Sequence, residues 1–539
     1  MKRTIKLLFC FVFFGLAGHA QPWQSYRQYG GDEADDFAVS TRLPSGEFLV
    51  AFSYDSQLAI FGQDTINVPS WYDFDIGLMK TSTTGDVIWA KRFGGANNGP
   101  ALGLDYPRCI AYDSVSGSII LAGTINGRNA TAGSCTLSQI TVMVLDSIGE
   151  CRWSLYGLYG YYSSIDDVCP DESGNVYVAG STAYIGSIGG TVIDSGAFVI
   201  KYDIIDGNVK WFRNVLPARS SIRIRYRNGN LYFAGFSGRP SITVDGIQLS
   251  GYDNDFLVGK MDTSGSIEWV HRYGGPGLEY LPSIALDDES NVLVSTRFED
   301  SCRVDTTTLY TSGAKGYLTM KLDSMGNLQW IRSGLASQLM PESITTGPDG
   351  SVLSNVLIYG TGYFGPDTLE PGSNPNQAYL LKYSAQGNYL GYISVENSVW
   401  GQQDVYVEPN GELTVWTSFQ IHASIPPFNL VSNGARDIVM ARHAPLVGIP
   451  EPGQRMNNSL VVYANPNQGN FRIEVPDRFQ RAAKLNLRIL DPQGRVVMDK
   501  TLTATDSRLE MQAGELASGL YELLLSDGKQ TARGRVVIE

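Results

Sequence analysis

The chain has 539 residues, of which 43% are hydrophobic, 11% aromatic and 18% charged, and it contains 59 glycines and 24 prolines. This composition is too apolar and aromatic for a disordered chain and too rich in turn-forming residues for a helical one. The length predicts two to four domains. A formal net charge of −13 leaves no basic footprint, so nucleic acid is not expected as a partner.

The first residues, 1–20, are expected to be a secretory signal peptide rather than part of the fold. Three basic residues precede an apolar run at 7–17 that is too short to span a bilayer. Small side chains before the junction predict cleavage between Ala20 and Gln21. The later chain has no apolar stretch long enough to cross a membrane, so the sequence predicts no transmembrane segment.

Exported chains can form disulfide bonds, and five cysteines follow residue 20. The odd number leaves at least one thiol free, and the spacings fit no zinc site. We expect one or two local bridges among the four cysteines that lie close together in sequence, Cys109, Cys135, Cys151 and Cys169.

Tryptophan recurs at intervals of about sixty residues along the first four fifths of the chain. In each unit an alternating strand precedes a glycine-containing tight turn, a strand with the tryptophan, Gly-Gly and two further short strands. Four short strands per repeat predict a β-propeller blade, because β-solenoid coils are shorter and lack tight hairpins. The recurring tryptophans are predicted to pack between blades: Trp89, Trp153, Trp211, Trp269 and Trp330.

The two ends of the repeat region are incomplete in a complementary way. The segment that begins at Trp23 holds only the tryptophan-type strand, whereas 404–443 holds the other three. One blade is therefore predicted to combine both ends, which removes the exposed edges of an open ring. The sequence thus predicts an all-β fold, with a seven-bladed β-propeller over residues 21–446.

The repeat units resemble a known family. FLVGKMDTSGSIEWVHRYGG at 256–275, followed by SIALDDESNVLVS at 283–295, is similar to extracellular bacterial β-propeller repeats of the SBBP type. The resemblance covers 22–446. It implies the propeller fold and leaves the activity open, because propellers carry many unrelated functions.

The period stops after residue 444, and the proline- and glycine-rich segment 447–458 is predicted to be a linker. Residues 459–539 then form a second domain. Its alternating segments predict a small immunoglobulin-like β-sandwich, with strands at 460–464, 470–475, 484–491, 495–501, 507–512, 519–526 and 531–538.

Three segments of this domain resemble the type A C-terminal sorting domain of the Bacteroidetes type IX secretion system. They are VYANPNQGNFRIEV, LRILDPQGRVV and LASGLYELLLSDGKQTARGRVVI, with matching positions at Asn465, Pro466, Asn467, Gly469, Asp491, Gly494, Arg495, Gly519 and Tyr521. The resemblance implies the type IX machinery as a partner and a secreted or outer-membrane surface-attached protein. An accessory carbohydrate-binding sandwich is the alternative.

Signals of catalysis are weak, and no catalytic residue is predicted. His271, His422 and His443 lie far apart, and no G-x-S-x-G or P-loop motif is present. Acidic clusters occur at 32–36, 166–167, 253–255 and 287–289. They leave a pair of catalytic carboxylates or a Ca²⁺ site open, although aspartate is common in turns and no EF-hand loop is present. No other cofactor is expected.

Asp-Ser/Thr motifs, such as Asp64-Thr65-Ile66 and Asp367-Thr368-Leu369, are similar to O-glycosylation acceptors of exported Bacteroidetes proteins. Turn chemistry explains some of them, and modification is left open.

Three functions remain. The first is a non-enzymatic binding or adhesion module that holds an unknown extracellular glycan, polymer or protein. The second is a polysaccharide-active enzyme with acidic residues at the propeller mouth, and the third is a structural surface component. Specificity loops are expected between blades at 55–73, 359–377 and 420–436.

Overall fold

A computed structural model describes residues 23–56, 59–62, 64–66, 74–96, 105–158, 163–217, 220–280, 282–311, 313–369, 376–395, 403–425, 428–444, 460–463, 469–475, 479, 484–490, 496–502, 508–517, 519–527 and 531–538. The chain divides into two compact units, Met1–Val447 and Gly448–Glu539. The expected signal peptide with its cleavage site Ala20–Gln21, and the expected linker 447–458, lie outside the described residues. The described part of the chain holds no helix long and apolar enough to cross a membrane.

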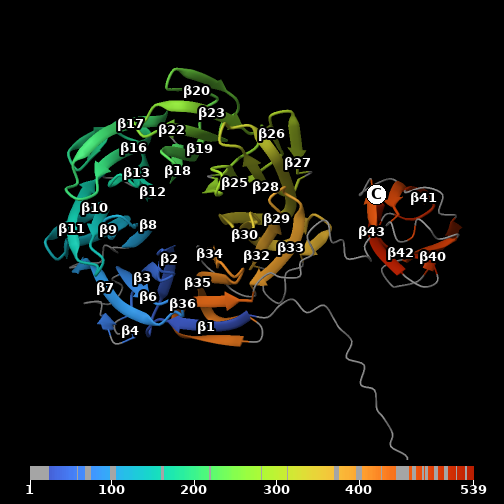
Figure 1. The fold of residues 1–539 in the computed structure, drawn as a ribbon, viewed down its shortest axis with the longest axis horizontal. Coiled ribbons are helices and arrows are strands. Elements are labelled where there is room, and N and C mark those ends of the chain that lie inside the picture. The colour runs from blue at the N-terminus through green and yellow to red at the C-terminus, as the bar shows by residue number, and fades with distance from the viewer. Residues whose placement is uncertain are drawn as a thin grey trace, which may run out of the picture. The chain divides into compact units, whose positions relative to one another are not determined.

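The first unit is a ring of four-stranded antiparallel sheets, which Figure 1 shows face-on. Each sheet runs from an innermost strand near the ring axis to an outermost strand at the rim. The innermost strands are β2 (Asp35–Arg42), β8 (Tyr106–Asp113), β12 (Ser163–Pro170), β18 (Ser220–Arg227), β24 (Ser283–Leu286), the second half of β29 (Leu328–Thr346) and β34 (Asp404–Val407). The second strands are β3 (Phe48–Tyr54), β9 (Ser118–Ala132), β13 (Asn175–Thr182), β19 (Asn230–Ser237), β25 (Val292–Phe298), β30 (Val352–Phe364) and β35 (Leu413–Ile425).

The third and outermost strands complete each sheet toward the rim of the ring. The third strands are β6 (Asp75–Thr81), β10 (Cys135–Leu145), β16 (Gly196–Asp203), β22 (Asp255–Asp262), β28 (Lys315–Leu322), β32 (Asn376–Tyr383) and β36 (Phe428–His443). The outermost strands are β7 (Val87–Ala96), β11 (Cys151–Gly157), β17 (Val209–Pro217), β23 (Ile267–Tyr273), the first half of β29, β33 (Tyr389–Val395) and β1 (Trp23–Tyr29).

The ring closes through strands from both ends of the unit. β1 pairs antiparallel with β36, with Tyr29 opposite Ile438, so the sheet β1–β36–β35–β34 contains the first and last strands of the ring. A ring of four-stranded sheets whose outermost strand leads to the innermost strand of the next sheet is a β-propeller. The first unit has this fold.

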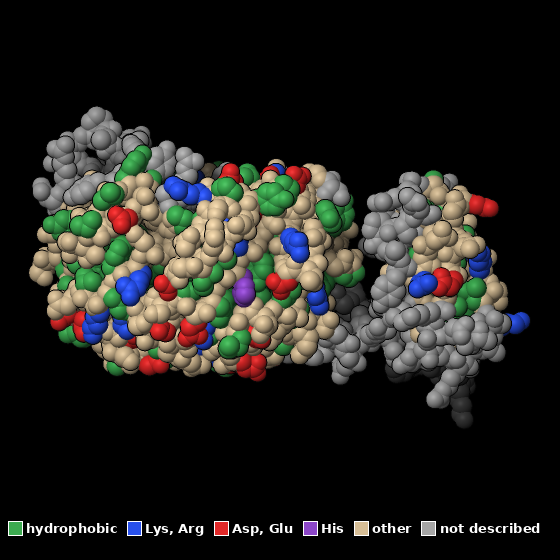
Figure 2. All heavy atoms as spheres, turned by 90° about the horizontal axis from the view of Figure 1, so that it is seen from above, with side chains coloured by type: hydrophobic (Ala, Val, Ile, Leu, Met, Phe, Trp, Pro, Cys, Tyr) green, Lys and Arg blue, Asp and Glu red, His purple; other side chains and the backbone are tan. Residues whose placement is uncertain are grey.

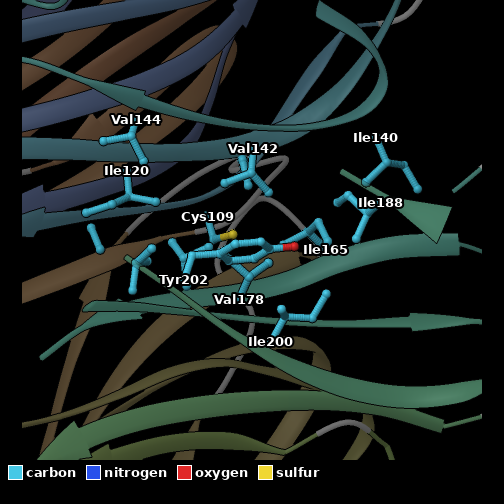
Figure 3. Close-up of a cluster of buried hydrophobic side chains, with 14 of the residues drawn as sticks. Cys109, Ile120, Ile140, Val142, Val144, Ile165, Val178, Ile188, Ile200 and Tyr202 are labelled. Atoms are coloured by element: carbon cyan, nitrogen blue, oxygen red, sulfur yellow. The ribbon is translucent and has the colours of Figure 1, made fainter. Parts of the chain in front are cut away.

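Neighbouring sheets pack face to face, which explains why their middle strands are hydrophobic on both faces. Figure 3 shows one such interface, where Ile120 and Val142 of one sheet meet Val178 and Ile200 of the next. Equivalent buried clusters lie between the other neighbouring sheets. One of them joins the first and last sheets through Phe48, Val50, Trp416 and Ile438.

The tryptophan of several outermost strands lies against a turn glycine of the next sheet. A Cβ on Gly326 would lie 3.0 Å from the ring of Trp269. The indole N–H donates to a backbone carbonyl across the same boundary, in Trp153–Ile204 (3.0 Å), Trp211–Thr263 (2.9 Å), Trp269–Ser324 (3.2 Å) and Trp330–Ala385 (3.0 Å). Trp89 has no such bond within the described residues but lies 3.1 Å from the Cβ position of Gly149. The tryptophan and the turn glycine of the repeat thus take part in one and the same contact between neighbouring sheets of the ring.

The Gly-Gly that follows several outermost strands has a steric cause. In three sheets the third strand has an aspartate, itself buried, directly beneath the first of these glycines. An added Cβ would meet the carboxylate in each case, at 1.6 Å for Gly94 and Asp75, 2.2 Å for Gly274 and Asp255, and 2.6 Å for Gly30 and Asp437. Only glycine fits this position.

Three segments that were expected to connect neighbouring blades instead connect the second and third strands of a single sheet. These segments are 55–73, 359–377 and 420–436. They carry short hairpins or strand extensions, such as β4 (Ala59–Phe61) with β5 (Asp64–Ile66), and β31 (Asp367–Leu369) against β30. Three other sheets have equivalent hairpins: β14 (Gly186–Ile188) with β15 (Thr191–Ile193), β20 (Ser241–Val244) with β21 (Ile247–Ser250), and β26 (Ser301–Val304) with β27 (Thr307–Tyr310).

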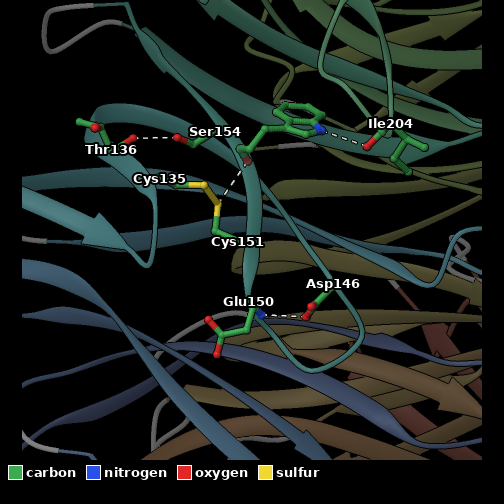
Figure 4. The surroundings of a disulfide bond; sticks show 8 residues. Cys135, Thr136, Asp146, Glu150, Cys151, Ser154 and Ile204 are labelled. Carbon is green, nitrogen blue, oxygen red and sulfur yellow. Dashed lines mark hydrogen bonds between the residues drawn. A yellow bond between two sulfur atoms is a disulfide. The ribbon is translucent and has the colours of Figure 1, made fainter.

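One disulfide bond joins the ends of neighbouring strands in one sheet. Cys135 of β10 pairs with Cys151 of β11, and Figure 4 shows it beside the bond from Ser154 to Thr136. Among the described cysteines Cys109, Cys169 and Cys302 are free and buried. The described residues therefore contain one local disulfide bond, where the sequence predicts one or two.

The second unit is built from two antiparallel sheets. One has the order β37 (Val461–Tyr463), β38 (Asn470–Glu474) and β41 (Arg508–Gln512). The other has the order β40 (Val496–Leu502), β39 (Leu485–Leu490), β42 (Gly519–Ser526) and β43 (Thr531–Ile538). Both sheets contribute to one buried core, which includes Phe471, Ile473, Leu487, Leu523 and Val536.

Candidate binding site on the axis of the ring

The rim of the ring gives little indication of a site on the face that Figure 2 shows, because acidic and basic side chains are interspersed there. The axis is different. A cavity of about 590 Å³ is lined by residues from the innermost strand of every sheet of the ring. This volume lies within the range of small-molecule binding sites.

The register of the sheets identifies the residues at one level of this cavity. In each innermost strand, one residue lies opposite the same repeat position of the adjacent second strand. These residues are Val39, Cys109, Asp167, Arg223, Ser283, Ser343 and Asp404. In four innermost strands a β-bulge immediately precedes this level, and the extra residue is Ala38, Arg108, Asp166 or Glu342. A bulge redirects a side chain locally, so three of the charged groups that line the cavity come from bulges.

Four side chains of this level tie one sheet to the next. Asp167 accepts the Ile224 N–H at 3.1 Å, and Asp404 accepts the Ser40 N–H at 2.6 Å. The Ser283 hydroxyl donates to the Glu342 carbonyl at 2.9 Å, and the Ser343 hydroxyl to the Gln403 carbonyl at 3.0 Å. These polar residues are therefore held by the architecture of the ring.

The arginines of the cavity fall into two groups. Arg225 donates to Asp167 at 2.5 Å, and Arg227 forms an ion pair with Asp288 at 2.6 Å. Arg108 and Arg223 make no hydrogen bond or ion pair with another described residue, and Arg223 Nε is buried. Arg108 is exposed and Arg223 is half-buried.

Burial raises the pKa values of three cavity carboxyl groups, those of Asp166, Asp404 and Glu342. The pKa of Asp166 is raised by burial, although hydrogen bonds from Ser164 and the Ile222 N–H oppose the shift. Burial also raises the pKa of Asp404 against its two bonds from Ser40. Burial raises the pKa of Glu342 to about 7, and the nearby charge of Arg223 lowers it only in part. Glu342 therefore changes charge near neutral pH.

Of the predicted acidic clusters, only 166–167 lines the cavity. Asp35 and Asp255 are buried away from it, and Asp255 pairs with Arg272 at 2.8 Å. Asp287 accepts backbone N–H groups of its own turn. Within the described residues no three His, Cys, Asp or Glu side chains are arranged to hold a metal ion.

The histidines lie apart, as their sequence positions suggested. His271 stacks on Trp269 with 5.2 Å between ring centroids, and a Cβ on the turn glycine Gly326 would lie 2.6 Å from its Nε2. His443 is buried beside Trp23, and His422 is exposed.

Sequence reasoning missed Arg108, Arg223, Glu342 and Asp404 as cavity residues. A signal was present: when the repeats are aligned on the second strand, all four fall at or next to one position. The position itself holds a valine, cysteine or serine in four repeats, at Val39, Cys109, Ser283 and Ser343, and a charged residue at Asp167, Arg223 and Asp404. The sequence alone, however, does not show that this repeat position faces the axis of the ring.

Most of the predicted sorting-domain motif lies outside the described residues, including Asn465, Pro466, Asn467, Asp491, Gly494 and Arg495. Gly469 has φ +87°, and a Cβ there would lie 2.5 Å from Gly514 Cα. Tyr521 of β42 is buried, and its hydroxyl donates to the Ala517 carbonyl at 2.7 Å. Gly519 begins the same strand.

Residues 461–539 match the family model described as a secretion system C-terminal sorting domain. The chain carries a type IX sorting domain. The protein is therefore exported by the type IX secretion system and is secreted or held at the cell surface. The resemblance of its three C-terminal segments to this domain is confirmed.

The chain also has one more distant curated relative. An uncharacterized WD repeat-containing protein of Acanthamoeba polyphaga mimivirus is 28% identical over a stretch that covers 28% of this chain and 12% of the viral protein. This chain thus spans about an eighth of that relative's length.

Solved structures with some likeness include a Trypanosoma rangeli sialidase in complex with sialic acid (TM-score 0.33, 10% identity, 96% of this chain and 87% of that one). A Bacillus subtilis glycoside hydrolase family 43 arabinoxylan arabinofuranohydrolase has a TM-score of 0.28 at 12% identity, covering 94% of each chain. A luciferin-regenerating enzyme has a TM-score of 0.32 at 11% identity, covering 64% of this chain and 94% of that one. Likenesses at these TM-scores support no conclusion about activity.

Proposed function

We propose that this protein is an exported, non-enzymatic binding or adhesion module whose propeller holds an extracellular glycan, polymer or protein at its axial cavity. The observation that carries the proposal is the cavity itself, which is lined by every sheet and contains polar groups that the ring does not use. Polar groups left unpaired in a concave site are the usual means of orienting a ligand.

The same proposal covers the organisation of the chain. Residues 1–20 would be removed by cleavage between Ala20 and Gln21, residues 21–446 would form a propeller of seven blades, and 447–458 would link it to the sorting domain at 459–539. An immunoglobulin-like sandwich accounts for the two sheets of that domain. The contacts of the five repeat tryptophans support their proposed role in packing blades together.

A thermal-shift screen of residues 21–539 tests the binding function, with polysaccharides and matrix proteins as probes and product analysis on every mixture. A ligand at a hundred times its dissociation constant adds about 2.7 kcal/mol to the free energy of unfolding. We expect a raised melting temperature without product. A panel without any shift, together with self-association of the protein, would favour a structural surface component instead.

A polysaccharide-active enzyme is the second candidate, because Glu342 has a pKa of about 7 and shares the cavity with Asp166. A general acid in glycoside hydrolysis needs a raised pKa, and a second carboxylate completes the pair. Release of sugars in the screen, abolished by Glu342→Gln, would establish this function and contradict the binding module.

A further inference from the structure

The polar groups of the axial cavity are unevenly used by the fold. Three of its carboxylates accept hydrogen bonds from the next sheet: Asp166 from the Ile222 N–H at 3.1 Å, Asp167 from Ile224 and Arg225, and Asp404 from Ser40. These carboxylates hold the ring together. They are not free to bind a ligand without loss of those bonds.

The guanidinium groups of Arg108 and Arg223, in contrast, form no hydrogen bond with another described residue. Arg223 is the polar side chain of its level that forms no bond to the next sheet, in contrast to Asp167, Ser283, Ser343 and Asp404. Its charge acts on Glu342, on Asp404 and on Asp166, which belong to three other sheets. Arg223 lines one cavity together with these three carboxyl groups.

Arg108 lines the same cavity from another sheet. It is the extra residue of the bulge that precedes Cys109. Arg108 is exposed and Arg223 is half-buried, so both guanidinium groups retain some access to solvent. A planar guanidinium group that has lost part of its hydration is best satisfied by an oxyanion, which takes two parallel N–H donors.

The remaining free groups suit hydroxyls. Gln403 is 2% exposed, and its Oε1 has no hydrogen-bond partner among the residues that the structure describes. Thr41 and Thr345 also line the cavity. A buried amide oxygen without a partner is costly, so a ligand that donates a hydroxyl hydrogen bond there gains affinity. Free cationic donors beside a free acceptor are the complement of a sugar that carries an acid group.

We propose that Arg108 and Arg223 bind the carboxylate or sulfate group of an acidic glycan that enters the axial cavity, with Gln403 accepting one of its hydroxyls. This inference rests on the proposed binding function and names its ligand class. A volume of about 590 Å³ admits a terminal sugar or a side group rather than a folded protein.

Isothermal titration of residues 21–539 tests the proposal with three oligosaccharides of matched length: an oligogalacturonate for carboxylate, a heparin fragment for sulfate and a neutral cello-oligosaccharide. We expect one or both acidic probes to bind, with an affinity that falls as salt rises. Arg223→Met should weaken that binding about tenfold to a hundredfold, the value of a charged hydrogen-bonded pair. Arg223→Lys keeps the charge and should lose less.

Arg213→Met is the matched control, because Arg213 is exposed on β17 at the rim. Its affinity for the acidic probe should equal that of the unaltered protein, and circular dichroism verifies that each variant is folded. Equal binding by Arg223→Met, tighter binding of the neutral probe, or displacement of the acidic probe by an acidic peptide would overturn the proposal. Binding of a neutral polymer alone would leave the proposed function standing, whereas no binding to any glycan, polymer or protein contradicts both.

Discussion

At the scale of single residues, two carboxyl groups near Gly274, those of Asp255 and Glu279, are buried in the fold. Asp255 lies beneath Gly274 and pairs with Arg272, so its charge is compensated. Glu279 follows five residues after the same glycine and is 4% exposed, and the N–H groups of Gly275 and of Glu279 itself compensate its burial only in part. Burial raises the pKa of Glu279 to about 9, and the charge of Asp255 adds to the shift.

This raised pKa makes stability depend on pH in a defined direction. Between the ordinary value of 4.5 and about 9, the folded chain keeps a proton on Glu279 that the unfolded chain releases. The contribution of Glu279 to the free energy of unfolding therefore falls by about 1.4 kcal/mol per pH unit in this window. Glu279→Gln removes the dependence. We expect the variant to lose less stability than the unaltered protein between pH 5 and pH 8, as measured by urea unfolding.

Glu289→Gln is the control for this measurement, because Glu289 is an exposed turn residue. Its pH dependence should match that of the unaltered protein. Parallel stability curves for the Glu279→Gln variant and the unaltered protein would show that Glu279 is ionised in the folded state.

At the scale of elements, each outermost strand supports the turn of the next sheet. The Trp269 indole of β23 lies against Gly326, whose φ of +87° no other residue adopts easily, and its N–H bonds the Ser324 carbonyl. Lys91 and Arg213 occupy the repeat position of His271 and likewise lie against a turn glycine. His271 thus makes the packing contact with the next turn that these two residues make in their own sheets.

Trp269→Phe should keep most of the apolar contact and lose the hydrogen bond to Ser324. We expect a loss of about 1 kcal/mol in the free energy of unfolding, since the carbonyl is left without its indole partner. His271→Lys introduces the residue found at the equivalent position 91 and should leave stability within about 0.5 kcal/mol. Chemical denaturation of the two variants compares them. An equal loss in both would show that the indole N–H contributes nothing specific.

At the scale of the whole molecule, two compact units carry separate tasks. The ring depends on β1 and β36, which bring the two ends of the propeller together. The second unit has its own core between two sheets, formed by residues such as Phe471, Leu487 and Leu523. A domain with its own buried core does not require its neighbour to fold.

Removal of residues 448–539 should therefore leave the melting temperature of the propeller unchanged while it stops export. Cell fractionation should find the shortened protein inside the outer membrane, because the sorting domain is missing. The reciprocal control fuses 448–539 to an unrelated folded reporter with a signal peptide, and this fusion should be exported. Export of the shortened protein would show that a second export signal lies in the propeller.

The sequence by itself determined the features that depend on local pattern. A tryptophan and a turn glycine repeat at one period because several outermost strands make the same contact with the turn of the next sheet. The strands of the second unit match their predicted ranges within two residues, since alternation along a strand directly reflects which side chains face the core. The sorting-domain segments were recognisable for the same reason.

The axial cavity was decided by the tertiary structure. Arg108, Arg223 and Glu342 lie in three different repeats and share no local motif, and only ring closure brings their strands to one axis. The pKa of Glu342 depends on burial by neighbouring sheets and on the charge of Arg223, and neither can be read from residues adjacent in sequence. The connections within the sheets were misplaced for a related reason: a segment's position in a ring depends on which strands pair, and pairing is a long-range property.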